Sequence, residues 1–246
     1  MEVLLGFAIA VAISLTGIGA GTVTTPLLIL FLGVSPAAAV GTALAFSGFV
    51  KIVSVPFYAA RRQVNFKVLR LLLFGGLPGV IAGSFFLDHA HRASRPAAVY
   101  FVLGVFIVIT ALVRLYRVFR PAVNKTPKDR SHLLPWLALP IGAEVGFSSA
   151  GAGALGSLLL LGMTPLTAAE VVGTDLCFGL VLSLAGGAIH IGAGNYDLPL
   201  LIQLGIGGLF GAFTGSMLAT RVNQRPLRIG LLLVLILLGC RLALHP

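Results

Sequence analysis

Two glycine-rich segments inside long apolar stretches contain the residue types best suited to binding an anion. The first covers residues 16–22 (TGIGAGT) and the second covers residues 148–153 (SSAGAG). Glycine lets the backbone approach a ligand closely, and a helix that starts after such a break presents unpaired N–H groups with a partial positive charge. Threonine and serine hydroxyls add hydrogen-bond donors. We therefore predict that the two segments hold one small oxyanion from opposite sides.

Close helix packing is the alternative explanation for glycines in apolar segments, because small residues let two membrane helices approach each other. Packing is the explanation we favour for the glycines of residues 75–83 and 207–215. For the two central segments, anion binding is our hypothesis and packing stays the alternative.

Charged residues inside apolar segments are costly in a membrane and therefore informative. Lys51 lies well inside such a segment, where its ammonium either pairs with the anion or reaches the interface on its long stem. Asp175 and Glu144 are candidates for a buried carboxylate that takes up and releases a coupled proton. Helix capping explains Glu170 more simply, and His190 is expected at the interface because it lies near the end of an apolar block.

The predicted site is therefore a binding site without a catalytic residue, metal or cofactor. Both cysteines, Cys177 and Cys240, stand singly in apolar segments and lack the paired spacing of a disulfide or a metal site. The predicted substrate-binding residues are Thr16, Gly17, Gly19, Gly21, Thr22, Lys51, Ser148, Ser149, Gly151 and Gly153.

Composition places these residues in a membrane. The 246 residues are 58% hydrophobic and 10% charged, whereas an ordinary soluble domain has about 25% charged residues. The net charge of +10 would suggest nucleic acid in a soluble protein. Here the basic residues fall between apolar runs, which indicates cytoplasmic loops and contact with lipid headgroups rather than a nucleic-acid partner.

Apolar blocks of membrane-spanning length predict an all-α, polytopic transmembrane bundle. The blocks cover residues 3–32, 36–60, 66–87, 96–117, 133–162, 165–192, 198–220 and 225–244. Blocks 3–32 and 133–162 are too long for one simple span, and each contains a glycine-rich segment near its middle. Backbone can leave helical geometry at membrane depth only where protein or a water-filled cavity satisfies its polar groups. We therefore expect broken or re-entrant helices around a site.

The sequence indicates that the two halves of the chain are copies of one unit. At an offset of 132 residues its glycines coincide, for example Gly19 with Gly151, Gly41 with Gly173 and the GGL of 75–77 with that of 207–209. Such self-similarity over a fixed offset indicates a repeated unit. It predicts a first transmembrane repeat at 1–119, a polar cytoplasmic linker at 120–132, and a second repeat at 133–246.

Charge predicts that the two repeats are inverted. Residues 61–70 carry four basic residues, whereas their counterparts at 193–202 carry none. Arginines cluster again in the second repeat at 221–228. If both basic loops and the linker are cytoplasmic, each repeat crosses the membrane an odd number of times. Inverted repeats with interrupted helices near the midplane are a recurring plan of secondary transporters.

The glycine and proline pattern resembles the sulfite exporter TauE/SafE family of membrane permeases. The resemblance rests on residues 17–26 (GIGAGTVTTP), 33–42 (GVSPAAAVGT) and 75–79 (GGLPG) with their echoes in the second half, and it covers nearly the whole chain. The family's Gly-Gly-Gly run is Gly-Ala-Gly here. The resemblance implies a bacterial inner-membrane protein that carries sulfite, organosulfonates or related organic anions.

These observations predict a secondary transporter that moves a small anion by alternating access with proton coupling. The expected partners are that anion and the lipid bilayer, with a homo-oligomer possible. An anion channel is the first alternative, because filter-like glycine breaks also occur in channels. An intramembrane enzyme is the second, although no nucleophile motif brings the serines and His190 together.

Overall fold

The computed structural model describes residues 2–16, 19–93, 96–119, 129–150, 153, 155–218 and 224–244. In chain order the elements are α1 (Glu2–Thr16), α2 (Ala20–Leu32), α3 (Pro36–Ala60), α4 (Phe66–Arg92), α5 (Pro96–Phe119), the short 3-10 helix η1 (Ser131–Leu133), α6 (Leu134–Ser148), α7 (Leu155–Met163), α8 (Ala168–Gly192), α9 (Leu198–Leu218) and α10 (Gln224–Leu244). The predicted all-α fold is confirmed. Of the described helices, α3, α4, α5, α8, α9 and α10 are long and apolar enough to cross a membrane.

The two long blocks are broken, as predicted. Block 3–32 forms α1 and α2, and block 133–162 forms α6 and α7. Helix α6 ends because Ser149 adopts a left-handed conformation with φ of 60°, and Gly153 in the same break has φ of 96°. Residues 17–18, 151–152 and 154 lie outside the described residues, so the predicted sites Gly17 and Gly151 do too.

Helix α8 starts with the cap that the sequence suggested for Glu170. The Thr167 side chain accepts a hydrogen bond from the Glu170 backbone N–H at 3.3 Å, and the Glu170 carboxylate accepts one from the Thr167 N–H at 2.9 Å. This reciprocal pair is a capping box, which satisfies two amides that a helix start leaves unpaired. The capping explanation for Glu170 is thus confirmed.

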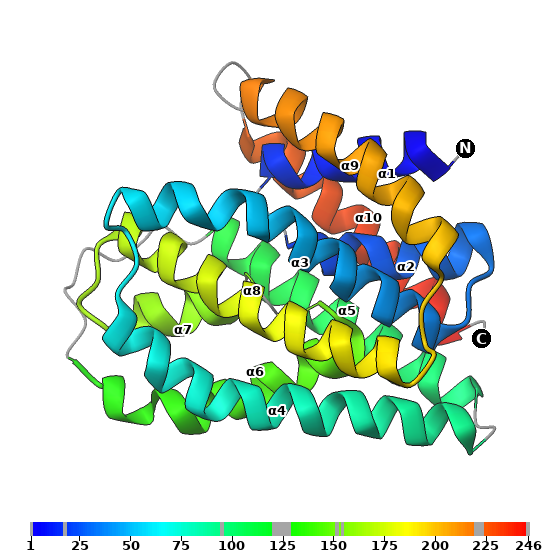
Figure 1. The fold of residues 1–246 in the computed structure, drawn as a ribbon, viewed down its shortest axis with the longest axis horizontal. Helices are drawn as coiled ribbons and strands as arrows, with labels where there is room; N and C mark the ends of the chain where they lie inside the picture. Colours follow the sequence, from blue (N-terminus) through cyan, green and yellow to red (C-terminus); the bar gives the residue numbers. More distant parts are fainter. Residues whose placement is uncertain are drawn as a thin grey trace.

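Helices α3 and α8 cross as an antiparallel pair at the centre of the bundle (Figure 1). Gly41 near the start of α3 packs against Asn195 just beyond the end of α8, and Gly173 near the start of α8 packs against Gln63 just beyond the end of α3. Around this pair, α1 packs along α9, α6 packs along α4, and α5 packs along α10. Exchanging the two halves of the chain therefore reproduces the same set of helix pairs.

Backbone crosses backbone at the glycines that the sequence assigned to packing. A Cβ on Gly75 would collide with the backbone oxygen of Pro135 in α6, and a Cβ on Gly207 would collide with that of Val3 in α1. Gly207 follows Gly75 by 132 positions, and Pro135 follows Val3 by the same number. The same holds for the contacts of Gly79 and Gly83 compared with those of Gly211 and Gly215. The packing explanation for these glycines is confirmed.

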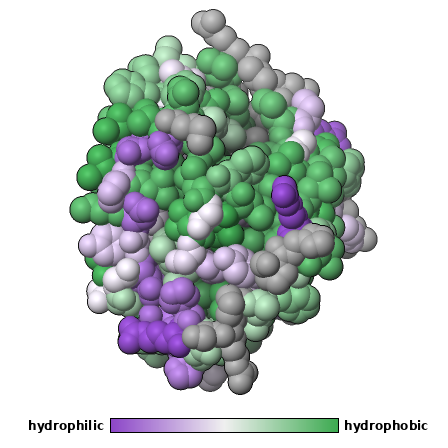
Figure 2. All heavy atoms as spheres, turned by 90° about the vertical axis from the view of Figure 1, so that its right-hand side faces the viewer, coloured by the Kyte–Doolittle hydropathy of each residue, from purple (hydrophilic) through white to green (hydrophobic). Residues whose placement is uncertain are grey.

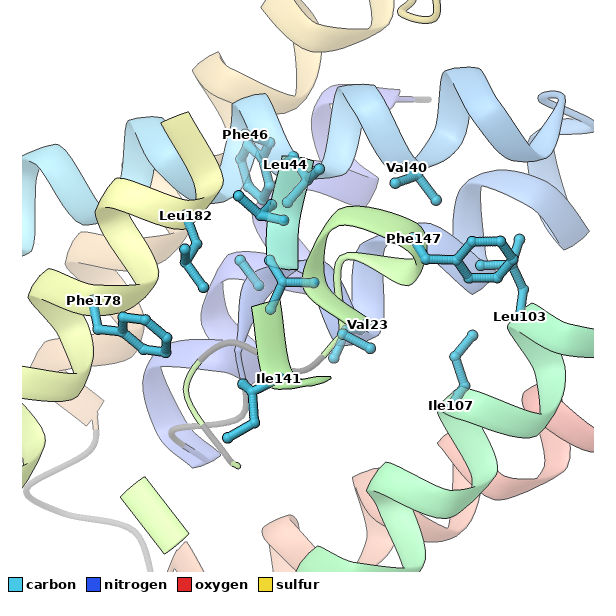
Figure 3. Close-up of a cluster of buried hydrophobic side chains, with 14 of the residues drawn as sticks. Val23, Val40, Leu44, Phe46, Leu103, Ile107, Ile141, Phe147, Phe178 and Leu182 are labelled. Atoms are coloured by element: carbon cyan, nitrogen blue, oxygen red, sulfur yellow. The ribbon is translucent and has the colours of Figure 1, made fainter. Parts of the chain in front are cut away.

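Two fully buried phenylalanines fill the matching positions on the central helices. Phe46 of α3 lies against Gly208, and Phe178 of α8 lies against Gly76. Figure 3 shows both rings in a cluster of buried apolar side chains that also includes Leu44 and Leu182. Because glycine leaves room for each ring, a side chain at either glycine would displace a buried aromatic.

Hydrogen bonds between loops and central helices follow the same relation. The Thr42 hydroxyl accepts a hydrogen bond from the Asp197 backbone N–H, and the Thr174 hydroxyl accepts one from the Asn65 N–H, both at 3.0 Å. Thr174 follows Thr42 by 132 positions, and Asp197 follows Asn65 by the same number. The sequence offset therefore describes three-dimensional contacts as well as residue identities.

The helix ends that flank the basic segments 61–70, 120–132 and 221–228 lie at one end of the bundle, whereas Arg92 lies at the other, where α4 ends. The ends that flank the connections α3–α4, α5–α6 and α9–α10 all lie toward the left of Figure 1. Figure 2 looks onto the opposite end, where hydrophilic residues gather in one region and hydrophobic residues cover much of the remaining described surface. Many exposed side chains are phenylalanine, leucine and isoleucine, as a lipid-facing surface requires.

We expect Gly207→Leu to destabilise the fold, because the added side chain meets the α1 backbone, and overpacking costs about 1–3 kcal/mol. Thermal unfolding in detergent, followed by size-exclusion chromatography, should show an apparent melting temperature several degrees lower. Gly205→Leu is the matched control on the same helix, since a Cβ at Gly205 meets nothing within 4 Å. Equal melting of both variants and the wild type would refute the packing role of Gly207.

Candidate functional site

A cavity of about 1110 Å³ lies between the two halves of the chain. Its wall comes from α1, the start of α2, α3, α5, α7, α8, α9 and α10, and it includes both glycine breaks through Gly19 and Gly153. The charged residues that line it are Lys51, Arg114, Arg117, Asp175 and Arg228. The cavity therefore combines the predicted breaks with an excess of positive charge.

The two breaks contact each other directly. The Thr22 hydroxyl donates a hydrogen bond to the Ala150 carbonyl at 2.7 Å, and the Ser149 hydroxyl donates one to the Gly21 carbonyl at 3.1 Å. Thr25 and Ser149 share a further hydroxyl–hydroxyl bond of 2.6 Å. A Cβ on Gly21 would collide with the Ser149 backbone, so this close contact needs glycine.

The predicted binding residues therefore fall into two groups. Gly19, Lys51 and Gly153 line the cavity, as does the predicted coupling residue Asp175. The second group is buried where the breaks meet and does not line the cavity; it comprises Gly21, Thr22, Ser148 and Ser149. Their hydroxyls bond to backbone carbonyls, and that of Ser149 bonds also to the Thr25 hydroxyl. The Ser148 hydroxyl donates to the Glu144 carbonyl at 3.0 Å. The side chain of Thr16 lies outside the described residues.

Lys51 keeps its ammonium inside the protein. The side chain is 7% exposed, and Nζ donates hydrogen bonds to the hydroxyls of Ser47 at 2.6 Å and Ser183 at 3.0 Å. Ser183 is the residue that the offset of 132 pairs with Lys51. Of the two alternatives for Lys51, the structure shows the internal position and not the extension to the interface. Its positive charge is available to the cavity.

Asp175 supplies the one carboxylate among the described cavity-lining residues. It is 3% exposed, accepts a hydrogen bond from the Ser157 hydroxyl, and lies within electrostatic reach of Lys51 and Arg114. Ser157 belongs to the first turn of α7, so the carboxylate lies beside the positive end of that helix. A Cβ on Gly156 would collide with Asp175 Oδ1, which explains the glycine there.

Arg114 is a cavity residue that the sequence interpretation missed. It is 9% exposed, and within the described part of the chain its Nε and Nη2 have no hydrogen-bond partner. The residue stands near the end of an apolar block with Arg117 one turn later, a pattern typical of a cytoplasmic flank. A buried guanidinium without partners is costly, so a ligand that accepts its hydrogen bonds would be stabilised there.

Glu144 lies outside the cavity. Its Oε1 accepts a hydrogen bond from the Thr110 hydroxyl at 2.7 Å, and Arg114 is within electrostatic reach. Glu144 on α6 therefore lies where its carboxylate balances the positive charge of Arg114 on α5. It does not line the cavity, so it is not placed to contact a ligand. Whether Glu144 or Asp175 exchanges a proton stays a prediction.

The expected interfacial position of His190 is wrong. Its side chain is fully buried, and Nε2 lies 3.0 Å from the Gly146 carbonyl oxygen of α6. The residue lies in the last turn of α8, but α6 and the backbone around Gly41 cover this end of the helix. The sequence showed how close His190 lies to the end of its apolar block, but it did not show which helices pack around it.

Chemically, the arrangement suits an anion better than a cation or a metal. Two buried cationic side chains and one buried carboxylate line the cavity, and no group of three His, Cys, Asp or Glu side chains among the described residues could hold a metal ion. A guanidinium donates two parallel hydrogen bonds to an oxyanion, and an ammonium adds a point charge.

Comparison with known proteins finds similarity to membrane transporters. The family model described as "Sulfite exporter TauE/SafE" matches residues 3–242. From Bacillus subtilis (strain 168), "Probable membrane transporter protein YjnA" is 28% identical over 229 residues, covering 89% of each chain. "Probable membrane transporter protein YunE" from the same organism is 25% identical over 232 residues, covering 87% of this chain and 83% of its own. No solved structure matches.

The family match spans both halves, both breaks and every helix that lines the cavity. The described helices include six that are long and apolar enough to cross a bilayer. The chain therefore belongs to the sulfite exporter TauE/SafE family, and it is a multi-pass membrane transporter of the cell membrane.

Proposed function

We propose that this protein is a secondary transporter that moves a small sulfur-containing or organic anion, and that the cavity between its halves is the binding site. The observation that carries the proposal is the pair of buried cations, Lys51 and Arg114, in a cavity bordered by Gly19 and Gly153. The family description names sulfite as an exported anion. An oxyanion supplies the acceptors that the Arg114 guanidinium needs.

The repeats of this transporter are inverted, and the antiparallel crossing of α3 and α8 supports that part of the proposal. Both helices occupy the same place in their halves, and their contacts repeat at the offset of 132. Two copies of one unit that run in opposite directions present the same surfaces to opposite sides of the membrane.

A difference between the two sides supports alternating access. The cavity-lining residues Val172, Leu176 and Ser157 have counterparts 132 positions earlier. These counterparts, Val40, Leu44 and Thr25, are at most 1% exposed. One side is therefore open and the equivalent side is packed. If the halves exchange conformations, the first side closes and the second opens, which delivers the anion across the membrane.

Flux measurements test the binding site. We expect purified protein in liposomes to move labelled sulfite in a saturable manner, with sulfoacetate, sulfate and chloride as comparison anions. Lys51→Met and Arg114→Gln should each lower flux at least about tenfold, because each removes one of the two buried cationic partners of the anion. Gly19→Leu should also lower it by filling the cavity wall.

Arg117→Gln is the matched control, since Arg117 lines the same cavity one turn along α5 but is exposed. It should retain most of the flux. Wild-type rates if Lys51→Met and Arg114→Gln fold and are correctly inserted would contradict the proposed site. A flux that never saturates would favour the anion channel.

Proton coupling gives a separate prediction for Asp175. We expect an inward-directed proton gradient to increase wild-type uptake and to have no effect on Asp175→Asn, which has no titratable carboxyl group. Ser157→Ala is the control, because it removes the hydroxyl that bonds to Asp175 but keeps the carboxyl. A proton-dependent Asp175→Asn would exclude Asp175 as the coupling residue, and Glu144→Gln would then be measured in the same assay.

Alternating access predicts opposite changes in reactivity at paired positions. Single cysteines replace Val172 or Val40 in protein that also carries Cys177→Ala and Cys240→Ala. Without substrate, a membrane-impermeant thiol reagent should modify Val172→Cys and spare Val40→Cys. Under transport conditions Val40→Cys should gain reactivity while Val172→Cys loses it. A Val40→Cys that stays unreactive while the protein transports would rule out this exchange.

A further inference from the structure

We infer that Asp175 limits the bound anion to a single negative charge, and that the rest of the cavity accommodates an apolar body attached to that charge. This inference rests on the proposed function and narrows its substrate class. It makes Asp175 a specificity-determining residue in addition to its candidacy for proton coupling.

Charge balance in the buried part of the cavity carries the first half of the inference. Lys51 and Arg114 contribute two positive charges, and Asp175 contributes one negative charge within electrostatic reach of both. A singly charged anion brings these three side chains to neutrality. A doubly charged anion leaves an excess negative charge in surroundings of low dielectric constant, which is costly.

Two further charges face Arg114, and they offset each other. Glu144 approaches it from outside the cavity, where Thr110 donates a hydrogen bond to the carboxylate. Arg228 lines the cavity and also lies within electrostatic reach of Arg114. Arg117 is exposed, so water and salt screen its charge. The balance is therefore set by Lys51, Arg114 and Asp175.

The size and lining of the cavity carry the second half. A volume of about 1110 Å³ slightly exceeds the range for small-molecule sites, about 300–1,000 Å³. A bare three-oxygen anion would leave most of it empty. Much of the wall is aliphatic and offers no hydrogen bond; examples are Ile13, Val50, Leu158, Val172, Leu176 and Leu209. Such a wall stabilises a hydrocarbon body by removing it from water.

The three charged residues that set the balance share one region of this cavity. Lys51 lies on α3, Arg114 on α5 and Asp175 on α8, and their electrostatic contacts place them together. The apolar lining extends from there over α7 and α9. A ligand with one charged head and one apolar body matches this division.

Competition with alkanesulfonates tests both halves in the intact protein. The probe is uptake of labelled 1-butanesulfonate into proteoliposomes, with protein-free liposomes as the correction for partition into lipid. For the wild type we expect inhibition constants to fall about two- to fourfold per added methylene from ethanesulfonate to hexanesulfonate. Butane-1,4-disulfonate, which differs from the probe by a second charge, should inhibit at least about tenfold more weakly than 1-butanesulfonate.

Asp175→Asn removes the negative charge that excludes the dianion. In this variant the difference between the disulfonate and the monosulfonate should shrink to about threefold or less. Ser157→Ala, which keeps the charge but loses the hydroxyl donor, should retain the wild-type difference. An unchanged preference in folded Asp175→Asn would overturn the role of Asp175.

A second pair of variants tests the apolar body. Ala212→Phe adds a ring to the cavity wall on α9 and should abolish the gain beyond butanesulfonate. Ile206→Phe on the same helix is exposed and lies outside the cavity lining, so it should leave the gain unchanged.

The outcomes separate this inference from the function on which it rests. If sulfite moves but neither chain length nor the second charge affects competition in the wild type, the inference is wrong and the transporter proposal stands. If neither sulfite nor any sulfonate moves, the proposed function fails first. The wild-type comparison of the two butane compounds decides the charge limit even where Asp175→Asn does not fold.

Discussion

The rest of the structure depends on one constraint, which is that backbone polar groups at membrane depth must be satisfied by protein. Both long blocks stop being helical near their middle, where no lipid group can replace the lost hydrogen bonds. The breaks meet this demand by contacting each other: Thr22 donates to the Ala150 carbonyl, and Ser149 donates to the Gly21 carbonyl. Satisfying one break therefore requires the other, which places both beside a single cavity.

Symmetric packing supports an asymmetric site. Glycine contacts, the Phe46 and Phe178 pockets and the loop hydrogen bonds all recur at the same offset. The charges do not recur, since Ser183 stands opposite Lys51 in the repeat and Ala43 stands opposite Asp175. Packing needs the same small residues in both halves because the same surfaces meet twice. The proposed binding site needs only one set of charges because one cavity lies between both halves.

The sequence was sufficient for the helices and the breaks, because both leave local signals. Apolar length and the glycine clusters located α1–α2 and α6–α7, and the offset of 132 located the glycines that pack. Arg114 could not be found in this way, since an arginine near the end of a span looks the same whether it faces a loop or a cavity. The hydroxyls of Thr22 and Ser149 were correctly placed at the breaks, but which group they contact is set by the opposite half of the chain.

His190 is a second residue whose surroundings the sequence did not reveal. Its counterpart in the first half, Tyr58, lines the cavity, whereas His190 is buried against the Gly146 carbonyl. One repeat position thus has two environments in a single structure. A difference of this kind is invisible to a sequence offset, which assigns equal surroundings to equal positions.

Asp175 connects the charge of the cavity to the geometry of the break. The same carboxylate lies within electrostatic reach of Lys51 and accepts the hydrogen bond of Ser157 in the first turn of α7. In the first half, Ala43 and Thr25 occupy the equivalent positions, so the start of α2 has no acidic partner there. An anion that enters the cavity adds negative charge beside a carboxylate that also holds a helix end. In the proposed mechanism, anion binding and the position of α7 are therefore coupled through the Asp175 side chain, and α2 lacks the equivalent carboxylate.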